Sequence, residues 1–178
     1  MGTPLARKRL LTIMACIIAL AFLTAPEVLC QVKPPDTDTP ATHNQRGVDF
    51  FKKGFYEHAP KNEAAKAELN YRLAIKEFKE AIAKDSSYTD AHRNLARIYY
   101  VQKNFEDAAW EYKKVTELAP SDLDAYVNLA LAYIELKELD VAVDTLENAK
   151  DHTTDPKVLD TLNGYITKIR NRQIKGVR

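Results

Sequence analysis

Cysteine is scarce in this chain of 178 residues, and both copies, Cys16 and Cys30, lie within the first thirty positions. Neither forms a CxxC pair, a zinc-ligand cluster or a haem-attachment motif. The five glycines build no phosphate-binding loop and no nucleophile elbow, and the four histidines lack the HExxH spacing of a metalloprotease. The sequence therefore shows no catalytic constellation, and we expect a protein that is not an enzyme and that needs no cofactor or metal.

An excess of charge of one sign is also lacking, since 26 basic residues face 25 acidic ones. Such a balance gives no overall field that would favour a nucleic-acid partner. The C-terminal end differs locally, because its five cations have no acidic residue among them: Lys168, Arg170, Arg172, Lys175 and Arg178. Favourable charge at the end of a helix, followed by a solvated basic tail at 171–178, is the simpler interpretation. Peripheral contact with anionic lipid, or with an acidic partner, is the alternative.

The chain has one long apolar run, from Leu10 to Ala25, which follows three basic residues and ends at Pro26. Its sixteen residues would span about 24 Å as a helix, less than the roughly 30 Å of a bilayer core. This layout is typical of a signal peptide at 1–30, and we predict cleavage after Cys30 and a periplasmic or otherwise exported protein. A retained anchor in the inner membrane and a lipid-modified cysteine are the alternatives. Residues 31–45, rich in proline and threonine, are predicted to be a flexible linker.

Three residues recur with a period of 34: Leu95, Tyr99 and Ala108 return as Leu129, Tyr133 and Ala142. A leucine and a tyrosine four residues apart lie on one face of a helix, which predicts that this face is buried. Ala96 and Ala130 follow the leucines, and their small side chains let a partner helix approach to about 8–10 Å. A 34-residue period with this pattern predicts two helices in each repeat.

In its period and residue pattern the chain resembles the tetratricopeptide repeat family, and we expect an exported bacterial member. The resemblance implies an all-α, right-handed superhelical solenoid of about three helix-turn-helix pairs and a C-terminal capping helix. We predict a repeat domain at 46–170, with repeats at about 48–88, 89–122 and 123–154 and the capping helix at 156–170. The first repeat departs from the pattern: its first helix is predicted at 48–58, and Asn62 is the expected cap of a lengthened second helix.

The resemblance also implies where a partner binds, because the first helices of successive repeats line a concave groove. The predicted groove residues are Arg93, Asn94, Arg97, Tyr100, Val127, Asn128, Leu131, Ile134 and Lys157. Such a surface could hold an extended or helical peptide. We therefore predict a non-catalytic adaptor that binds a protein or peptide, as part of a cell-envelope complex. The alternatives are an accessory subunit of an envelope enzyme and a membrane-surface protein that acts through its basic C-terminus.

Chaperone-binding members of the family grip a terminal carboxylate with basic and asparagine residues on consecutive first helices. Arg93, Arg97, Asn128 and Lys157 fall at or near the corresponding places, but Arg97 stands where that pattern has asparagine, and Thr161 stands where it has a further basic residue. Scattered solvated charge is therefore the favoured interpretation. The single tryptophan, Trp110, is predicted to be a packing residue of a second helix and not a ligand platform.

Overall fold

The computed structural model describes residues 38–176, with side chains up to Arg172. These residues belong to one compact unit, Asp38–Arg178. The predicted signal peptide, both cysteines and the first part of the predicted linker lie outside the described residues. Within 38–176 no helix combines the length and the hydropathy needed to cross a membrane.

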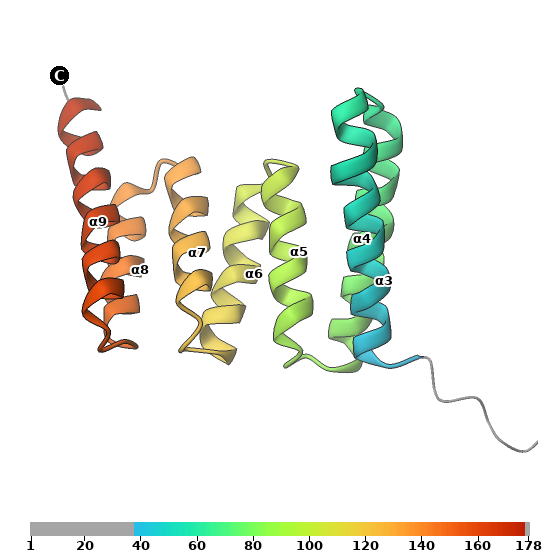
Figure 1. The fold of residues 1–178 in the computed structure, drawn as a ribbon, viewed down its shortest axis with the longest axis horizontal. Coiled ribbons are helices and arrows are strands. Elements are labelled where there is room, and N and C mark those ends of the chain that lie inside the picture. The colour runs from blue at the N-terminus through green and yellow to red at the C-terminus, as the bar shows by residue number, and fades with distance from the viewer. Residues whose placement is uncertain (1–37, 177–178) are drawn as a thin grey trace, which may run out of the picture. The chain divides into compact units, whose positions relative to one another are not determined.

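Seven α-helices follow one another along the described unit, and no strand occurs among residues 38–176. They are α3 (Pro40–Lys52), α4 (Ala64–Lys84), α5 (Thr89–Val101), α6 (Phe105–Leu118), α7 (Leu123–Glu135), α8 (Leu139–Lys150) and α9 (Pro156–Gly176). Each helix packs against the next one in sequence, so that α3–α4, α5–α6 and α7–α8 form successive antiparallel pairs and α9 covers α8 (Figure 1). The predicted all-α solenoid of three helix pairs and a capping helix is confirmed.

The two complete repeats share their turns as well as their helices. Lys103 and Lys137, which are 34 residues apart, both have a positive φ, 61° and 67°, at the tight turn between the two helices of a pair. Asp122 caps α7 by accepting a hydrogen bond from the backbone N–H of Ala125, as expected for an aspartate at this position. Asp155, before Pro156 at the start of α9, accepts in the same way from the N–H of Lys157.

The first helix pair differs from the prediction. Helix α3 begins at Pro40, where a capping box joins Thr39 and Thr42, so residues 40–45 are helical and not part of a linker. Thr39 followed by proline is a helix-start signal that the surrounding linker-like composition obscures. After Lys52 the chain continues as a π-helix at Lys53–His58 and a short 3₁₀ turn at Ala59–Lys61.

Asn62 does not cap the second helix of this pair, contrary to the prediction. It has a φ of 58° and ends the 3₁₀ turn, and α4 begins two residues later at Ala64. Asparagine tolerates the left-handed conformation better than most residues, which explains its place at this turn. Helix α4 is long, as predicted, and ends at Lys84.

The core runs along the array where the paired helices meet. Leu95 and Leu129 are buried, and Ala96 and Ala130 are buried beside them, as the repeat pattern predicts. Helix α9 covers the last pair with three buried residues, Leu162, Ile166 and Ile169. It extends to Gly176, so the segment 171–178 is not a separate tail but begins inside this helix. Lysine and arginine at a helix C-terminus favour such an extension.

Candidate functional site

Two of the recesses on the described unit are lined by first helices of the repeats. The first, which we name the aromatic recess, has a volume of about 200 Å³. Its lining comes from the N-terminal helices and from α5, α6 and α7. The lining residues that carry the argument are Phe51, Phe55, Tyr56, Arg97, Tyr100 and Asn128, and Leu131 closes the recess on the α7 side.

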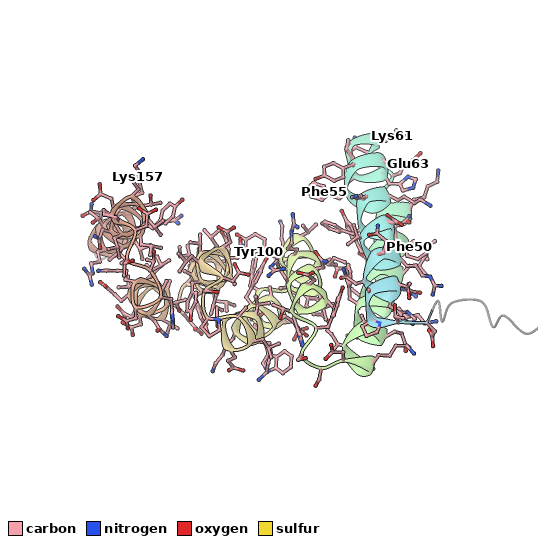
Figure 2. All side chains as sticks on the ribbon, turned by 60° about the horizontal axis from the view of Figure 1, so that its bottom comes forward. Phe50, Phe55, Lys61, Glu63, Tyr100 and Lys157 are labelled. Atoms are coloured by element: carbon pink, nitrogen blue, oxygen red, sulfur yellow. The ribbon has the colours of Figure 1, made fainter. Side chains whose placement is uncertain are left out.

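The π-helix supplies the exposed aromatic rings of this recess. Phe55 packs against Phe51, with ring centroids 5.5 Å apart, and meets Tyr56 edge to face at 5.0 Å. Tyr56 is 65% exposed. Figure 2 shows Phe55 on the side of the N-terminal helices that faces Tyr100 of α5. Single-turn π-helices are frequent at functional sites, and exposed aromatic rings contribute large contact areas to interfaces.

The polar side chains of the aromatic recess are Arg97, Asn128 and three tyrosines, Tyr56, Tyr100 and Tyr112. Arg97 is exposed, and it makes no ion pair or hydrogen bond with any described residue. Burial raises the pKa of Tyr112 to about 12, and burial likewise raises the pKa of Tyr100. Both hydroxyls therefore stay protonated at neutral pH and can donate hydrogen bonds. The recess thus offers a cation and neutral donors beside aromatic rings.

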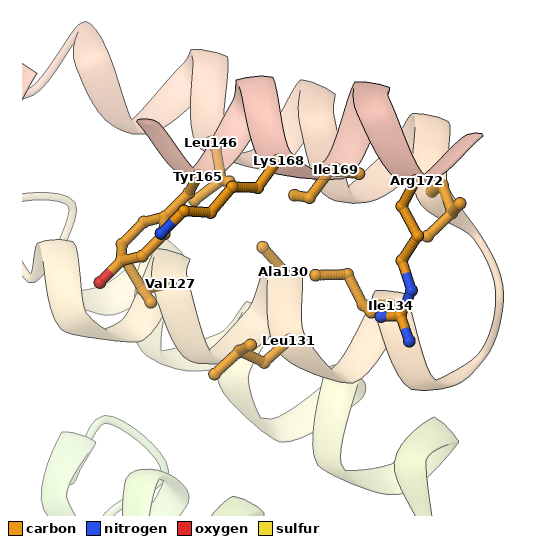
Figure 3. Close-up of a pocket in the computed structure, with 10 residues that line it drawn as sticks. Val127, Ala130, Leu131, Ile134, Leu146, Tyr165, Lys168, Ile169 and Arg172 are labelled. Atoms are coloured by element: carbon orange, nitrogen blue, oxygen red, sulfur yellow. The ribbon is translucent and has the colours of Figure 1, made fainter. Parts of the chain in front are cut away.

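The second recess, which we name the basic recess, is larger, with a volume of about 290 Å³. One wall is α7, which contributes Val127, Ala130, Leu131 and Ile134. The other wall is α9, which contributes Tyr165, Lys168, Ile169 and Arg172 (Figure 3). Leu139 and Leu146 of α8 complete the lining, which includes no acidic residue. Leu131 borders both recesses, and they therefore adjoin along α7.

Most of the predicted groove residues gather around these two recesses. Arg97, Tyr100, Asn128 and Leu131 line the aromatic recess, and Val127, Leu131 and Ile134 line the basic recess. Both the polar and the aliphatic parts of the predicted groove are thus brought onto connected surfaces. The Asn128 side chain, however, already donates a hydrogen bond of 2.9 Å to the carbonyl of Asp124.

Three predicted groove residues lie outside both recesses. Arg93 is held in ion pairs with Asp90 and, at 2.6 Å, with Asp122, and Asn94 donates to the side-chain oxygen of Asn44 at 3.0 Å. Lys157 lies at the end of the array opposite Phe55 (Figure 2). The residues that resemble a carboxylate clamp therefore do not all lie together. The Arg93 guanidinium already pairs with two carboxylates of this chain.

Sequence reasoning missed the aromatic wall at Phe51–Tyr56, and it named Lys168 and Arg172 as part of a basic C-terminus without predicting that they face α7. The spacing of Lys168 and Arg172, four residues apart on one helix, was the available signal for the basic wall on α9. The interpretation of Trp110 was wrong, since this residue is 57% exposed and its ring lies beneath the Lys114 amine, 5.6 Å from the ring centroid. Trp110 lines neither recess.

Comparison with known proteins places these features in a family context. A family model described as tetratricopeptide repeat matches residues 63–122 and 104–156. The Hsp70-Hsp90 organising protein of Plasmodium falciparum (isolate 3D7) is 36% identical over 56 residues, which are 32% of this chain and 10% of that protein. The chain thus spans only a small part of that relative's length.

Two solved structures show the same fold. The TPR2B domain of yeast Sti1, in complex with pHsp70, aligns with a TM-score of 0.58 and 19% identity, over 75% of this chain and 97% of that one. The MamA protein aligns with a TM-score of 0.54 and 22% identity, over 66% of this chain and 56% of that one. At these identities the resemblance establishes the architecture and leaves the function to be argued from the recesses.

Proposed function

Because the chain belongs to the tetratricopeptide repeat family, we propose that it is a non-catalytic adaptor that binds a segment of a partner protein. The observation that carries this proposal is the continuity of the aromatic and basic recesses, which share Leu131 along α7. Together they form one groove with aromatic, cationic and aliphatic walls. A protein segment can place side chains in both recesses at once, which a small ligand confined to one of them cannot do.

The chemistry of the groove also suits protein binding. Aromatic and arginine side chains dominate the energetics of protein interfaces, because they bury large areas while keeping polar groups for orientation. Tyr56, Tyr100 and Arg97 supply these groups in the aromatic recess. The pHsp70 complex of the yeast Sti1 domain supports the class of ligand, a protein or peptide, without identifying the partner of this chain.

Capture of partners from cells tests the groove. We expect the double variant Arg97→Glu, Tyr56→Ala to reduce recovery of the bound protein about tenfold or more, because it removes a cation and an exposed ring from the aromatic recess. The measurement is crosslinking of the full chain in cells, followed by affinity capture and quantitative mass spectrometry. Trp110→Ala is the matched control, since it removes an exposed aromatic side chain outside both recesses.

Unchanged recovery by the double variant, together with a loss in Trp110→Ala, would move the binding surface to the face that carries α6 and would reject the groove. A loss that occurs only on removal of residues 173–178 would support the alternative of a site in the basic C-terminus. Circular dichroism of each variant shows whether the helices are retained.

We further propose that the adaptor works outside the cytoplasmic membrane, in a cell-envelope complex. The basic and apolar layout of residues 1–30 supports this proposal. Mass spectrometry of the protein purified from its native cells should find Gln31 as the first residue. An intact Met1 in the membrane fraction would indicate an anchor, a lipid-modified cysteine would indicate a lipoprotein, and an intact Met1 in the cytosol would contradict export.

A further inference from the structure

The basic recess combines an aliphatic interior with two cations at its edge. Val127, Leu131 and Ile134 form the α7 wall at spacings of four and three residues, and Tyr165, Lys168 and Arg172 form the α9 wall at spacings of three and four. Figure 3 shows Val127 near Tyr165 at one end and Ile134 near Arg172 at the other. The two walls therefore run side by side over two helical turns, a slot about 10 Å long.

A slot of this length matches the apolar anchors of a short helix. Side chains at positions i, i+3 or i+4, and i+7 of an α-helix lie on one face and span about 10 Å. A partner helix placed along the slot would contact both walls and insert these anchors between them, which is how amphipathic helices bind grooves in general. Leu131 and Tyr165 are both partly exposed, so this surface is accessible.

The two cations at the edge of the slot have no carboxylate partner among the described residues. The Lys168 amine lies over the Tyr165 ring, 5.8 Å from its centroid, and neither Lys168 nor Arg172 forms an ion pair with any described residue. Arg170, between them in sequence, does have one, with Glu147 at 3.3 Å. Cations beside an apolar surface favour a ligand that brings carboxylates to the same place, because charge is screened less strongly there than in open water.

We propose that the basic recess binds a short amphipathic helix of the partner protein, with a stripe of apolar residues flanked by aspartate or glutamate. The apolar stripe enters the slot, and the carboxylates pair with Lys168 and Arg172. This inference rests on the proposed function of the groove and specifies the chemistry of the segment that it holds. It also assigns to Lys168 and Arg172 a role in recognition that is separate from a contact with membranes.

Fluorescence anisotropy with the full chain tests this assignment. The probes are three labelled synthetic helical peptides: one with leucine at i, i+4 and i+7 flanked by glutamate, one with the same leucines flanked by lysine, and one with serine in place of leucine. We expect the leucine–glutamate peptide to bind with about micromolar affinity, and the other two to bind at least about tenfold more weakly. Lys168→Glu with Arg172→Glu should weaken the first peptide at least tenfold.

Lys157→Glu is the matched control, because it reverses a charge on the same helix outside the recess and should leave binding of the first peptide unchanged. Equal binding of the glutamate and lysine peptides, no binding of any peptide, or no effect of the double variant would overturn the proposal. Binding of decanoate, but of no peptide, would show a small-ligand site instead and would also overturn it.

Partner capture separates this inference from the proposed function. If recovery of the cellular partner depends on Arg97 and Tyr56 but not on Lys168 and Arg172, the groove remains the binding site and the assignment of the basic recess fails. If neither pair of residues affects recovery, both fail. Dependence on both pairs, together with the preference for the glutamate peptide, is the expected result.

Discussion

Replacing His92 by leucine is expected to lower the free energy of unfolding by about 3–5 kcal/mol, the cost of breaking a buried ion pair by removing one partner. His92 is 4% exposed, and its Nδ1 lies 2.6 Å from a carboxylate oxygen of Glu111, which is also buried. In the variant, the Glu111 carboxylate would lose its counterion while remaining out of water. Urea denaturation at neutral pH measures the difference.

The hydrogen bonds of His92 indicate that the ring is a cation. Its Nε2 lies 3.1 Å from the carbonyl oxygen of Ser86, which can only accept, and its Nδ1 faces the Glu111 carboxylate. With Glu111 ionised, both ring nitrogens donate, as they do only in imidazolium. The hydrogen bond that His92 donates to Glu111 raises the pKa of His92 above its ordinary value, against the opposing effect of burial.

This direction of shift predicts how stability changes with pH. Because the pKa of His92 is higher in the folded chain than in the unfolded one, the stabilisation is fully present below about pH 6.5. It is lost as the pH rises through the folded pKa. Unfolding curves between pH 6 and pH 10 should show a decline that is smaller in Glu111→Gln, which removes the main cause of the shift.

A second buried histidine with carboxylate partners also contributes to the loss of stability at high pH. His43 is held between Glu77, at 2.8 Å, and Asp38, at 2.6 Å, and the hydrogen bond that its ring donates to Glu77 is the main reason why the pKa of His43 is also raised. Glu77 and Glu111 are 34 residues apart, at the same position of successive repeats. We therefore expect Glu77→Gln combined with Glu111→Gln to reduce the decline further than either change alone.

His152→Leu is the control for the first substitution. His152 is exposed and stacks on the ring of Tyr126, with centroids 5.4 Å apart, so the same change there should cost less than about 1 kcal/mol. Similar losses in His92→Leu and His152→Leu would contradict the structural role of the buried pair.

Changing Gly47 to alanine is expected to destabilise the fold by about 1–3 kcal/mol through overpacking. A Cβ atom at Gly47 would lie 2.5 Å from the Phe78 ring, and Phe78 is fully buried against α3 and α5. Because the Phe78 ring is surrounded by other side chains, it cannot move aside to relieve this contact. The gain in helix propensity on replacing glycine, up to about 1 kcal/mol, is too small to offset this clash.

Replacing Gly164 by alanine should have the opposite effect on stability. Gly164 lies on the exposed side of α9, and nothing is within 4 Å of where its Cβ would be placed. Gly164→Ala is therefore expected to stabilise the fold by about 0.5–1 kcal/mol. Chemical denaturation of the two variants and of the parent chain measures both changes in the free energy of unfolding. A more stable Gly47→Ala variant would show that α3 does not approach α4 as closely as described.

The sequence alone determined the repeat architecture, because a helical repeat that buries one face must place the same residue types at the same spacing. Leu95 and Leu129, Ala108 and Ala142 carry that signal, and all four are buried at equivalent places. The helix caps at Asp122 and Asp155 also follow from the local sequence, since capping depends on residues only two or three positions away. The bounds of the first helix pair were harder to predict. Proline can begin a helix or end one, and the sequence near Pro40 and Pro60 is compatible with both.

Only the tertiary structure decided which exposed residues form one groove. Lys168 and Arg172 are separated by more than thirty residues from the α7 wall that they face, and their partnership depends on how closely α9 packs beside α7 and α8. The same is true of Arg93, which sequence placed in the groove but which the fold pairs with Asp122 at the start of the next helix pair. Helical periodicity fixes the face on which a side chain lies, whereas the neighbour that it meets is set by the packing of different helices.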